Sequence, residues 1–337
     1  MNMAEVQSIN DDPAPSAAPA VAARGRLRAR RRVRTWALMA PAVGLLAIWM
    51  IVPLALTLWY SLQGYNLLSP PQGFVGLDNY EYLLTDPGLP VVIWNTIVLV
   101  VAALVVTIVL GTLIAVLFDQ AFYGRAIARL LVVAPFFVMP TVSALVWKNL
   151  LMHPVYGLFA WISRWLGLTP IDWFADYPMV AIIIIIAWEW TPFAALILLT
   201  SLQSLDRDLV EAARMDGAGP IANFTFITLP HLARPIVIVV MLETIFFLAI
   251  YAEILVTTVG GPGLATTNLP FFIYSRALLA FDVGGASAGG ILAIVLANAV
   301  TFFFVRAAKT RLRPASGVSP CCRSMTSMTG SGAPPSL

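Results

Sequence analysis

The sequence has little charge, almost no cysteine and almost no histidine. Charged residues make up 11% of the 337 residues and hydrophobic residues 60%, whereas a soluble domain contains about 25% and about 45–50%. This composition excludes an ordinary soluble protein. The aromatic content of 11% also excludes a disordered chain, because disordered segments are poor in large apolar residues. We therefore expect an integral membrane protein.

Several classes of chemistry lack the residues that they require. The two cysteines are adjacent, at 321–322, and so provide neither a disulfide framework nor a metal-site spacing. The only lysines are Lys148 and Lys309, and neither completes a Gly-x-x-x-x-Gly-Lys-Ser/Thr phosphate loop. We expect a protein that is not an enzyme, has no cofactor of its own and does not bind ATP through such a loop.

Six stretches are long and apolar enough to cross a bilayer, which requires about 20 residues as a helix. The first, second and sixth contain no charged residue, and the third contains Pro135 and Pro140, which are expected to kink it. The predicted fold is an all-α polytopic membrane protein with six transmembrane helices, over residues 36–62, 91–118, 128–150, 178–201, 234–257 and 283–305.

The basic residues are distributed unevenly between the predicted loops. If the N-terminus is cytoplasmic, 17 of the 20 Lys and Arg residues fall on the cytoplasmic side, as the positive-inside rule requires. Seven lie between Arg24 and Arg34; nucleic-acid binding is the alternative explanation, but their position beside a span favours a topology anchor and no nucleic-acid partner. We expect both termini in the cytoplasm, disordered tails over 1–34 and 314–337, and a transmembrane domain over 35–313.

The loop between the fourth and fifth spans, at about 204–230, contains the clearest local signals. Ser204 or Asp206 can cap a helix whose apolar residues recur at helical spacing. Gly217 is expected to end that helix, and Pro220 to begin a second one that returns to the membrane. The sequence therefore predicts a helix-turn-helix in this loop.

This loop resembles the EAA loop of binding-protein-dependent ABC importer permeases. The family pattern is Glu-Ala-Ala, three residues, Gly, nine residues and then Ile-x-Leu-Pro, and this sequence matches it at 211–213, 217 and 227–230. The resemblance implies that the loop forms a coupling helix, which sits in a cleft of an ATP-hydrolysing subunit. The residues that it assigns to this contact are Glu211, Ala212, Ala213, Asp216, Gly217 and Ala218.

A second set of residues resembles carbohydrate permeases related to maltose transporters. It comprises TTVGGPG over 257–263, TTNL over 266–269 and Tyr274, and the stretch 243–253 looks most like the sorbitol/mannitol (polyol) subgroup. The resemblance implies a subunit of the bacterial inner membrane that transports a sugar or polyol. It also implies a second permease, two ATP-binding subunits that bind the ATP, and a periplasmic or lipid-anchored substrate-binding protein.

Three acids lie within the predicted spans, where a charged side chain is costly and usually faces a partner, a cavity or water. Two of them, at positions 243 and 253, are expected on one helix, about 15 Å apart along its axis. One hypothesis is a pathway for a neutral polyhydroxylated ligand, because hydroxyl groups bind carboxylate acceptors and aromatic faces. The alternative is structural pairing or contact with headgroup water. The residues assigned to the pathway are Glu189, Trp190, Glu243, Tyr251, Glu253 and Asn298.

Two other function classes are alternatives. A proton-coupled secondary transporter would use the same acids as proton carriers, but such proteins usually contain inverted repeats, and none is evident in this sequence. A membrane-embedded enzyme is a more distant alternative. A run of small residues over 284–290 in the last span predicts close packing against a second subunit.

Overall fold

The computed structural model describes residues 18–70 and 72–311. Within these residues the chain forms helices and loops, and the only β pairings are the isolated bridges Gln63–Phe74 and Asn66–Asp282. The chain divides into two compact units, one up to Trp59 and one from Tyr60 onward. The prediction of an all-α protein is confirmed for the described residues.

Helix α1 (Ala18–Ser61) contains the first predicted span. Its apolar part, Met39–Ser61, is long enough to cross a membrane, and the large side chains of Leu45 and Trp49 are exposed. The helix begins at Ala18, so the Arg cluster at 24–34 is helical, whereas the sequence predicted a disordered tail there. The predicted tail segments 1–17 and 314–337 lie outside the described residues.

Four further stretches match predicted spans and are apolar enough to cross a membrane. Three are single helices: α3 (Leu89–Asp119), α8 (Pro178–Leu202) and α14 (Val283–Arg311). The fourth runs over Pro220–Phe247 and comprises α10 (Pro220–Asn223), the π-helical η3 (Phe224–Thr228) and α11 (Leu229–Phe247). Shorter helices connect them: α2 (Asp78–Thr85), α6 (Leu158–Trp165), α7 (Trp173–Asp176), α9 (Arg207–Met215), α12 (Ala252–Thr257), α13 (Leu269–Tyr274) and η4 (Ser275–Leu279).

The third predicted span consists of two limbs that meet at 106°, not of one kinked helix. Its first limb is α4 (Arg125–Val133) with the 3-10 turn η1 (Ala134–Phe137), and its second is α5 (Pro140–Val146) with the π-helical η2 (Trp147–Leu151). Met139 between the limbs is extended, with ψ 136°, because the ring of a following proline disfavours the helical conformation. The described residues therefore contain five candidate spans, or six if the bent pair counts as one.

The fifth predicted span also ends earlier than expected. Helix α11 ends at Phe247, the chain is not helical at Ile250 and Tyr251, and α12 is a separate helix. The expectation that Glu243 and Glu253 share one helix is therefore wrong. No proline or glycine lies between positions 243 and 257, so the break has no local sequence signal.

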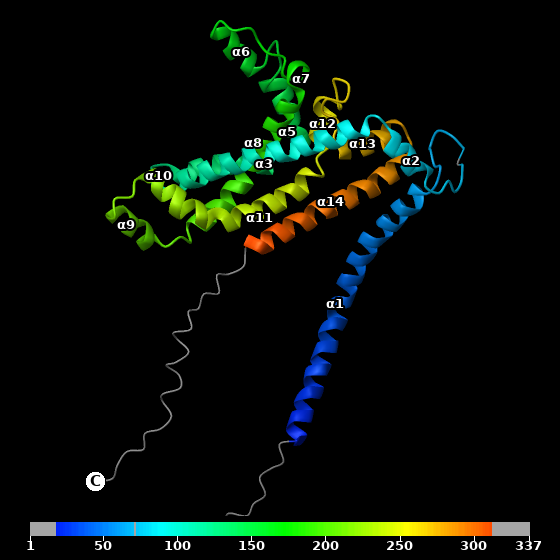
Figure 1. Cartoon of the computed structure of the whole chain (residues 1–337), viewed down its shortest axis with the longest axis horizontal. Coiled ribbons are helices and arrows are strands. Elements are labelled where there is room, and N and C mark those ends of the chain that lie inside the picture. Colours follow the sequence, from blue (N-terminus) through cyan, green and yellow to red (C-terminus); the bar gives the residue numbers. More distant parts are fainter. Residues whose placement is uncertain (1–17, 71, 312–337) are drawn as a thin grey trace, which may run out of the picture. The chain divides into compact units, whose positions relative to one another are not determined.

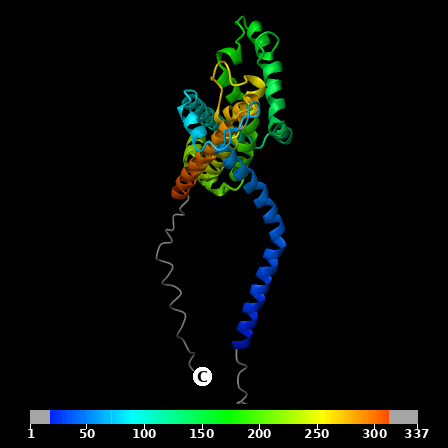
Figure 2. The same cartoon turned by 90° about the vertical axis from the view of Figure 1, so that its right-hand side faces the viewer.

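The larger unit is organised around the contact between α3 and α8, its most extensive helix pair (Figure 1). These helices approach closely because Gly111 of α3 lies against Ala194 of α8, where a Cβ at position 111 would be 2.7 Å from the alanine Cβ. Buried apolar side chains of α11 and α12 add to this core, including Phe247 and Ile254. Within the same unit, α6 and α7 project as an arm (Figures 1 and 2).

The small residues at the start of α14 pack within this chain, whereas the sequence predicted a contact with a second subunit. Gly284 lies against the backbone of Gln63, Gly289 lies against the side chain of Ile273, and Ala288 is fully buried. These residues therefore pack within the chain itself, and the contact of this run with a second subunit stays a prediction.

An ion pair joins two segments that the sequence placed on the same side of the membrane. Arg276 of η4 donates to the carboxylate of Asp86, which follows α2. The guanidinium also lies over the rings of Tyr82 and Phe272. The contact agrees with the prediction that both segments lie on the same side of the membrane.

Candidate functional site

The loop between α8 and α11 contains the predicted helix-turn-helix. Helix α9 begins after Asp206, whose carboxylate accepts a hydrogen bond from the backbone N–H of Asp208 at 3.1 Å. Of the two predicted caps, Asp206 is therefore the one used, while the hydroxyl of Ser204 donates to the carbonyl of Ser201 at 2.7 Å. The cap satisfies one of the N–H groups that every helix leaves free at its start.

Gly217 ends α9, as predicted. Its φ of 87° lies in the left-handed region, which a residue with a Cβ rarely adopts. The N–H of Ala218 donates to the carbonyl of Ala213 at 2.9 Å, and the N–H of Gly217 donates to the carbonyl of Arg214 at 3.0 Å. This pair of bonds is the Schellman motif. Pro220 then begins α10, also as predicted.

The tip formed by α9 and the turn after it carries the six residues that the resemblance assigned to coupling. Four of them are exposed, Glu211, Ala212, Asp216 and Gly217, while Ala213 and Ala218 are half-buried. Two large apolar side chains of α9 are also exposed, those of Leu209 (53%) and Met215 (88%). Exposed apolar groups gathered in one place are typical of a surface that contacts a partner.

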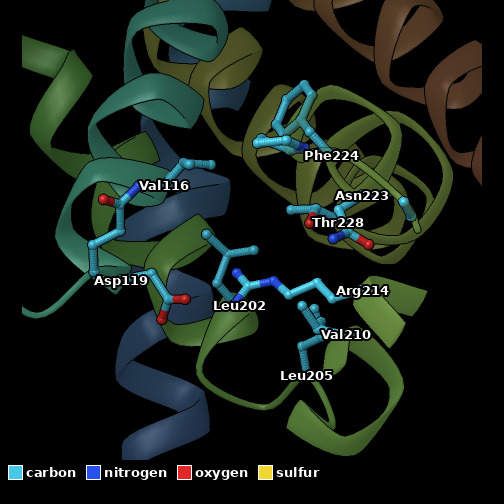
Figure 3. Close-up of a pocket in the computed structure, with 12 residues that line it drawn as sticks. Val116, Asp119, Leu202, Leu205, Val210, Arg214, Asn223, Phe224 and Thr228 are labelled. Atoms are coloured by element: carbon cyan, nitrogen blue, oxygen red, sulfur yellow. The ribbon is translucent and has the colours of Figure 1, made fainter. Parts of the chain in front are cut away.

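A pocket of about 460 Å³ lies beside α9. Residues from the ends of α3 and α8, and from α9, α10 and η3, line it, and the side chain of Arg214 extends across it toward Leu202 and Asp119 (Figure 3). Asn223 in its wall is buried, and its Oδ1 atom has no hydrogen-bond partner. The pocket thus lies between α9 and the ends of α3 and α8.

The three acids of the predicted spans are all buried, but they lie in two different places. Glu243 of α11 is fully buried and accepts a hydrogen bond from the hydroxyl of Thr107 on α3 at 2.7 Å. Glu189 of α8 and Glu253 of α12 are 4% and 3% exposed, and they lie near each other. Glu243 thus has the structural partner that the alternative hypothesis expected.

A second pocket, of about 240 Å³, brings three of the predicted pathway residues together. Trp190 of α8, Tyr251 at the helix break and Glu253 of α12 line it. Glu189, Glu243 and Asn298 do not belong to its lining, and the amide of Asn298 donates to the carbonyl of Ile294, one turn back in α14. We call this pocket, lined by Pro140, Trp190, Phe246, Ala249, Ile250, Tyr251, Ala252 and Glu253, the break pocket.

Three of the eight residues that line the break pocket are aromatic. The rings of Trp190 and Phe246 are 4.8 Å apart, and the ring of Tyr251 stacks on that of Tyr274 at 5.4 Å. Tyr251 is 41% exposed, so its ring remains accessible. The sequence reasoning missed Pro140 and Phe246, which show their relevance only once the helices bend and break.

The fold and these two features define a class of protein: a multi-span helical membrane component with an exposed helix-turn-helix loop and a pocket between interrupted helices. Residues 108–314 match the family described as "Binding-protein-dependent transport system inner membrane component". The chain belongs to this family. The prediction of an importer permease in the inner membrane, made from the EAA loop, is confirmed at this level.

The chain is similar to several known permeases. It is 36% identical over 285 residues, which are 84% of this chain and 92% of the relative, to the probable ABC transporter permease protein y4oQ of Sinorhizobium fredii. It is 32% identical over 288 residues, 85% of this chain and 97% of the relative, to the trehalose/maltose transport system permease protein MalF of Thermococcus litoralis. The fold matches a chain in the crystal structure of a bacterial ABC transporter involved in the import of the acidic polysaccharide alginate, with a TM-score of 0.73. The two chains are 20% identical, and the match covers 86% of this chain and 100% of that one.

Proposed function

We propose that this chain is the permease subunit of an importer for a neutral sugar or polyol, and that α9 transmits the motion of an ATP-hydrolysing subunit. The observation that carries the coupling role is the exposed tip of the loop. Its acids, Glu211 and Asp216, lie beside exposed apolar side chains and small residues. An ATPase surface can approach the small residues closely and pair its arginines with the carboxylates.

A continuous helical segment supports transmission from this tip to the break pocket. The 28 residues of Pro220–Phe247 begin at the turn after α9. Phe247 is the last helical residue before the break at Ile250 and Tyr251. At the rise of an α-helix such a segment is about 42 Å long, enough to cross the membrane. A tilt of this segment at the cytoplasmic side therefore moves the wall of the break pocket, as alternating access requires.

The lining of the break pocket supports a neutral, hydroxyl-rich cargo. It combines aromatic faces, on which sugar rings stack, with the carboxylate of Glu253, which accepts hydrogen bonds from hydroxyl groups. No lysine or arginine lies among the eight lining residues, so an anion would find no countercharge there. The trehalose/maltose permease among the relatives fits this class, and a sorbitol or mannitol cargo is the finer proposal.

The proposed complex contains a second permease, two ATP-binding subunits and a periplasmic or lipid-anchored substrate-binding protein, with both termini of this chain in the cytoplasm. ATP is bound by the partner subunits. The first test is co-purification from native membranes in mild detergent. We expect an ATPase and a second permease to accompany the wild-type chain, and the ATPase to be lost from the Glu211→Arg variant.

Glu81→Arg is the matched control, because Glu81 is an exposed acid on α2, predicted on the opposite side. Retention of the ATPase by Glu211→Arg, or its equal loss from Glu81→Arg, would contradict the coupling role. Uptake of radiolabelled trehalose, maltose, sorbitol and mannitol by cells, with and without a protonophore, then tests the cargo. Uptake that requires the proton gradient but no ATPase would favour the secondary transporter instead.

Residues of the break pocket are tested by the same uptake assay. Trp190→Ala should raise the KM for the transported sugar about tenfold or more, because a stacked aromatic face and its burial contribute on the order of 1.5 kcal/mol. Trp161→Ala is the control, since Trp161 is 60% exposed on α6, outside the pocket. An unchanged KM for Trp190→Ala would place the sugar elsewhere.

A further inference from the structure

The short helix α12 is held at both of its ends by side chains from other parts of the chain. Just before its start, the carbonyl oxygen of Ile250 accepts a hydrogen bond from the amide of Asn268 at 2.6 Å. At its end, the carbonyl oxygens of Val256 and Thr257 accept hydrogen bonds from the ammonium of Lys148 at 3.0 and 2.6 Å. Both contacts reach backbone groups that an interrupted helix leaves without a partner of its own.

Lys148 is a cation in the second limb of the bent span. It is half-buried in η2, and its ammonium donates hydrogen bonds to these two carbonyls. A charge in such a position is costly unless it is bonded, so its ammonium favours the arrangement in which α12 stays against this limb. Helices α5 and α12 also pack against each other (Figure 1), and Pro140, the first residue of α5, lines the break pocket with Tyr251 and Glu253.

Asn268 is itself fixed in place by its surroundings. It is fully buried, and its Oδ1 atom accepts a hydrogen bond from the N–H of Phe271 at 3.0 Å, which caps α13. The loop before it is fastened to α3, because the amide of Asn95 donates to the carbonyls of Leu264 and Thr267 at 2.7 and 3.1 Å. The orientation of the Asn268 amide toward Ile250 is therefore determined by α3 and α13 rather than by α12.

We propose that Lys148 and Asn268 are positioning residues for the break pocket. Asn268 fixes the start of α12 and Lys148 fixes its end, so that Tyr251 and Glu253 face Trp190. Neither residue lines the pocket. Lys148 also makes α12 move together with the α5–η2 limb when the transporter changes between its two states. This inference rests on the proposed role of the break pocket.

The test measures access to position 251 in the full chain, in nanodiscs with its partner subunits. Tyr251→Cys is combined with Cys321→Ser and Cys322→Ser, and its rate of modification by a negatively charged methanethiosulfonate reagent is recorded. Lys148→Met should change this rate about tenfold. It removes a hydrogen bond made by a charged group, and such a bond contributes about 1.4 kcal/mol, which corresponds to a factor of ten. Lys148→Arg should restore the wild-type rate within about twofold, because a guanidinium also donates several hydrogen bonds.

Asn268→Ser provides an independent variant. Serine is also a good N-cap, so α13 keeps its cap, while the shorter side chain loses the bond to Ile250. We expect the same direction of change at Tyr251→Cys as for Lys148→Met. Faster hydrogen exchange should also appear in a peptide over 248–257, with little change elsewhere.

Two controls separate positioning from general loss of structure. Arg164→Met removes an exposed basic residue of α6 and should leave the rate at position 251 unchanged. A second reporter, Tyr156→Cys, replaces a side chain that is 66% exposed outside the pocket and should react at the same rate with and without Lys148→Met. An unchanged rate at position 251, equal changes at both reporters, or no rescue by Lys148→Arg would overturn the proposal.

These readouts require no sugar and no ATP hydrolysis. If the uptake panel finds no transported sugar while the rates at position 251 change as expected, the proposed cargo fails and the positioning of α12 stands. Once a cargo is known, Lys148→Met should raise its KM more than it lowers the maximal rate at which the cargo is transported. A lower maximal rate with an unchanged KM would show that Lys148 acts on something other than the pocket.

Discussion

Replacing Gly217 tests whether the shape of the α9 tip, and not only its charge, is needed for coupling. The residue has φ 87°, and its N–H donates to the carbonyl of Arg214 at 3.0 Å. Alanine in this conformation costs about 1–2 kcal/mol. Proline fixes φ near −65° and removes the N–H, so it cannot adopt the turn and costs about 3 kcal/mol or more. A Cβ at position 217 would meet nothing within 4 Å, so the effect is confined to the backbone.

These costs fall on a helix of nine residues, which is marginal without support. Gly217→Ala should therefore weaken retention of the ATPase about tenfold, and Gly217→Pro more than 100-fold, if the free energy appears in binding. The assay is quantitative co-purification of the ATPase, together with uptake of the transported sugar. Both variants should reach the membrane in normal amounts, because the spans are unchanged.

Gly167 offers a closely matched control. It follows α6 with φ 76°, and the N–H of Leu168 donates to the carbonyl of Ser163 at 2.8 Å in the same Schellman arrangement. It also has open space where a Cβ would be placed. Gly167→Pro should strain its turn equally and leave ATPase retention unchanged. Normal retention by Gly217→Pro, or equal loss from Gly167→Pro, would refute the coupling argument.

Two further predictions concern the stability of the larger unit. Gly111→Val should lower the melting temperature in detergent, because its side chain would overlap Ala194, and overpacking costs about 1–3 kcal/mol; Gly44→Val, at a position with nothing within 4 Å, should have little effect. Asp86 and Arg276 form a partly buried ion pair, and replacing either one by a neutral residue should lower the free energy of unfolding by about 1–3 kcal/mol. The double variant should cost less than the sum of the two, and additive losses would show that the pair is not coupled.

The features that the sequence predicted correctly depend on neighbouring residues. Asp206 caps α9 because its own carboxylate reaches the N–H two residues on, and Gly217 ends the helix because it alone tolerates φ 87° at little cost. The positions of the spans follow from runs of about 20 apolar residues, which no loop could bury. The EAA loop combines these local signals with a fixed spacing, and this combination identified the family.

The features that the sequence did not predict depend on contacts between distant residues. Hydropathy locates an apolar segment but not its direction, so the 106° bend and the helix break before α12 remained hidden. The break lies where Asn268 binds Ile250 and Lys148 binds the end of α12, across separations of 18 and more than 100 residues. The one sequence signal for these contacts was the single lysine, Lys148, within the third predicted span.

The sequence by itself determined the membrane class, the approximate spans and the helix-turn-helix of the loop at 204–230, because hydropathy and helix caps act over a few residues. The tertiary structure decided which embedded groups meet. It pairs Glu243 with Thr107 of another helix, and it gathers Trp190, Tyr251 and Glu253 around one pocket. Such groupings arise because buried polar groups must find partners wherever packing brings them, and packing is set by the whole chain rather than by any single segment.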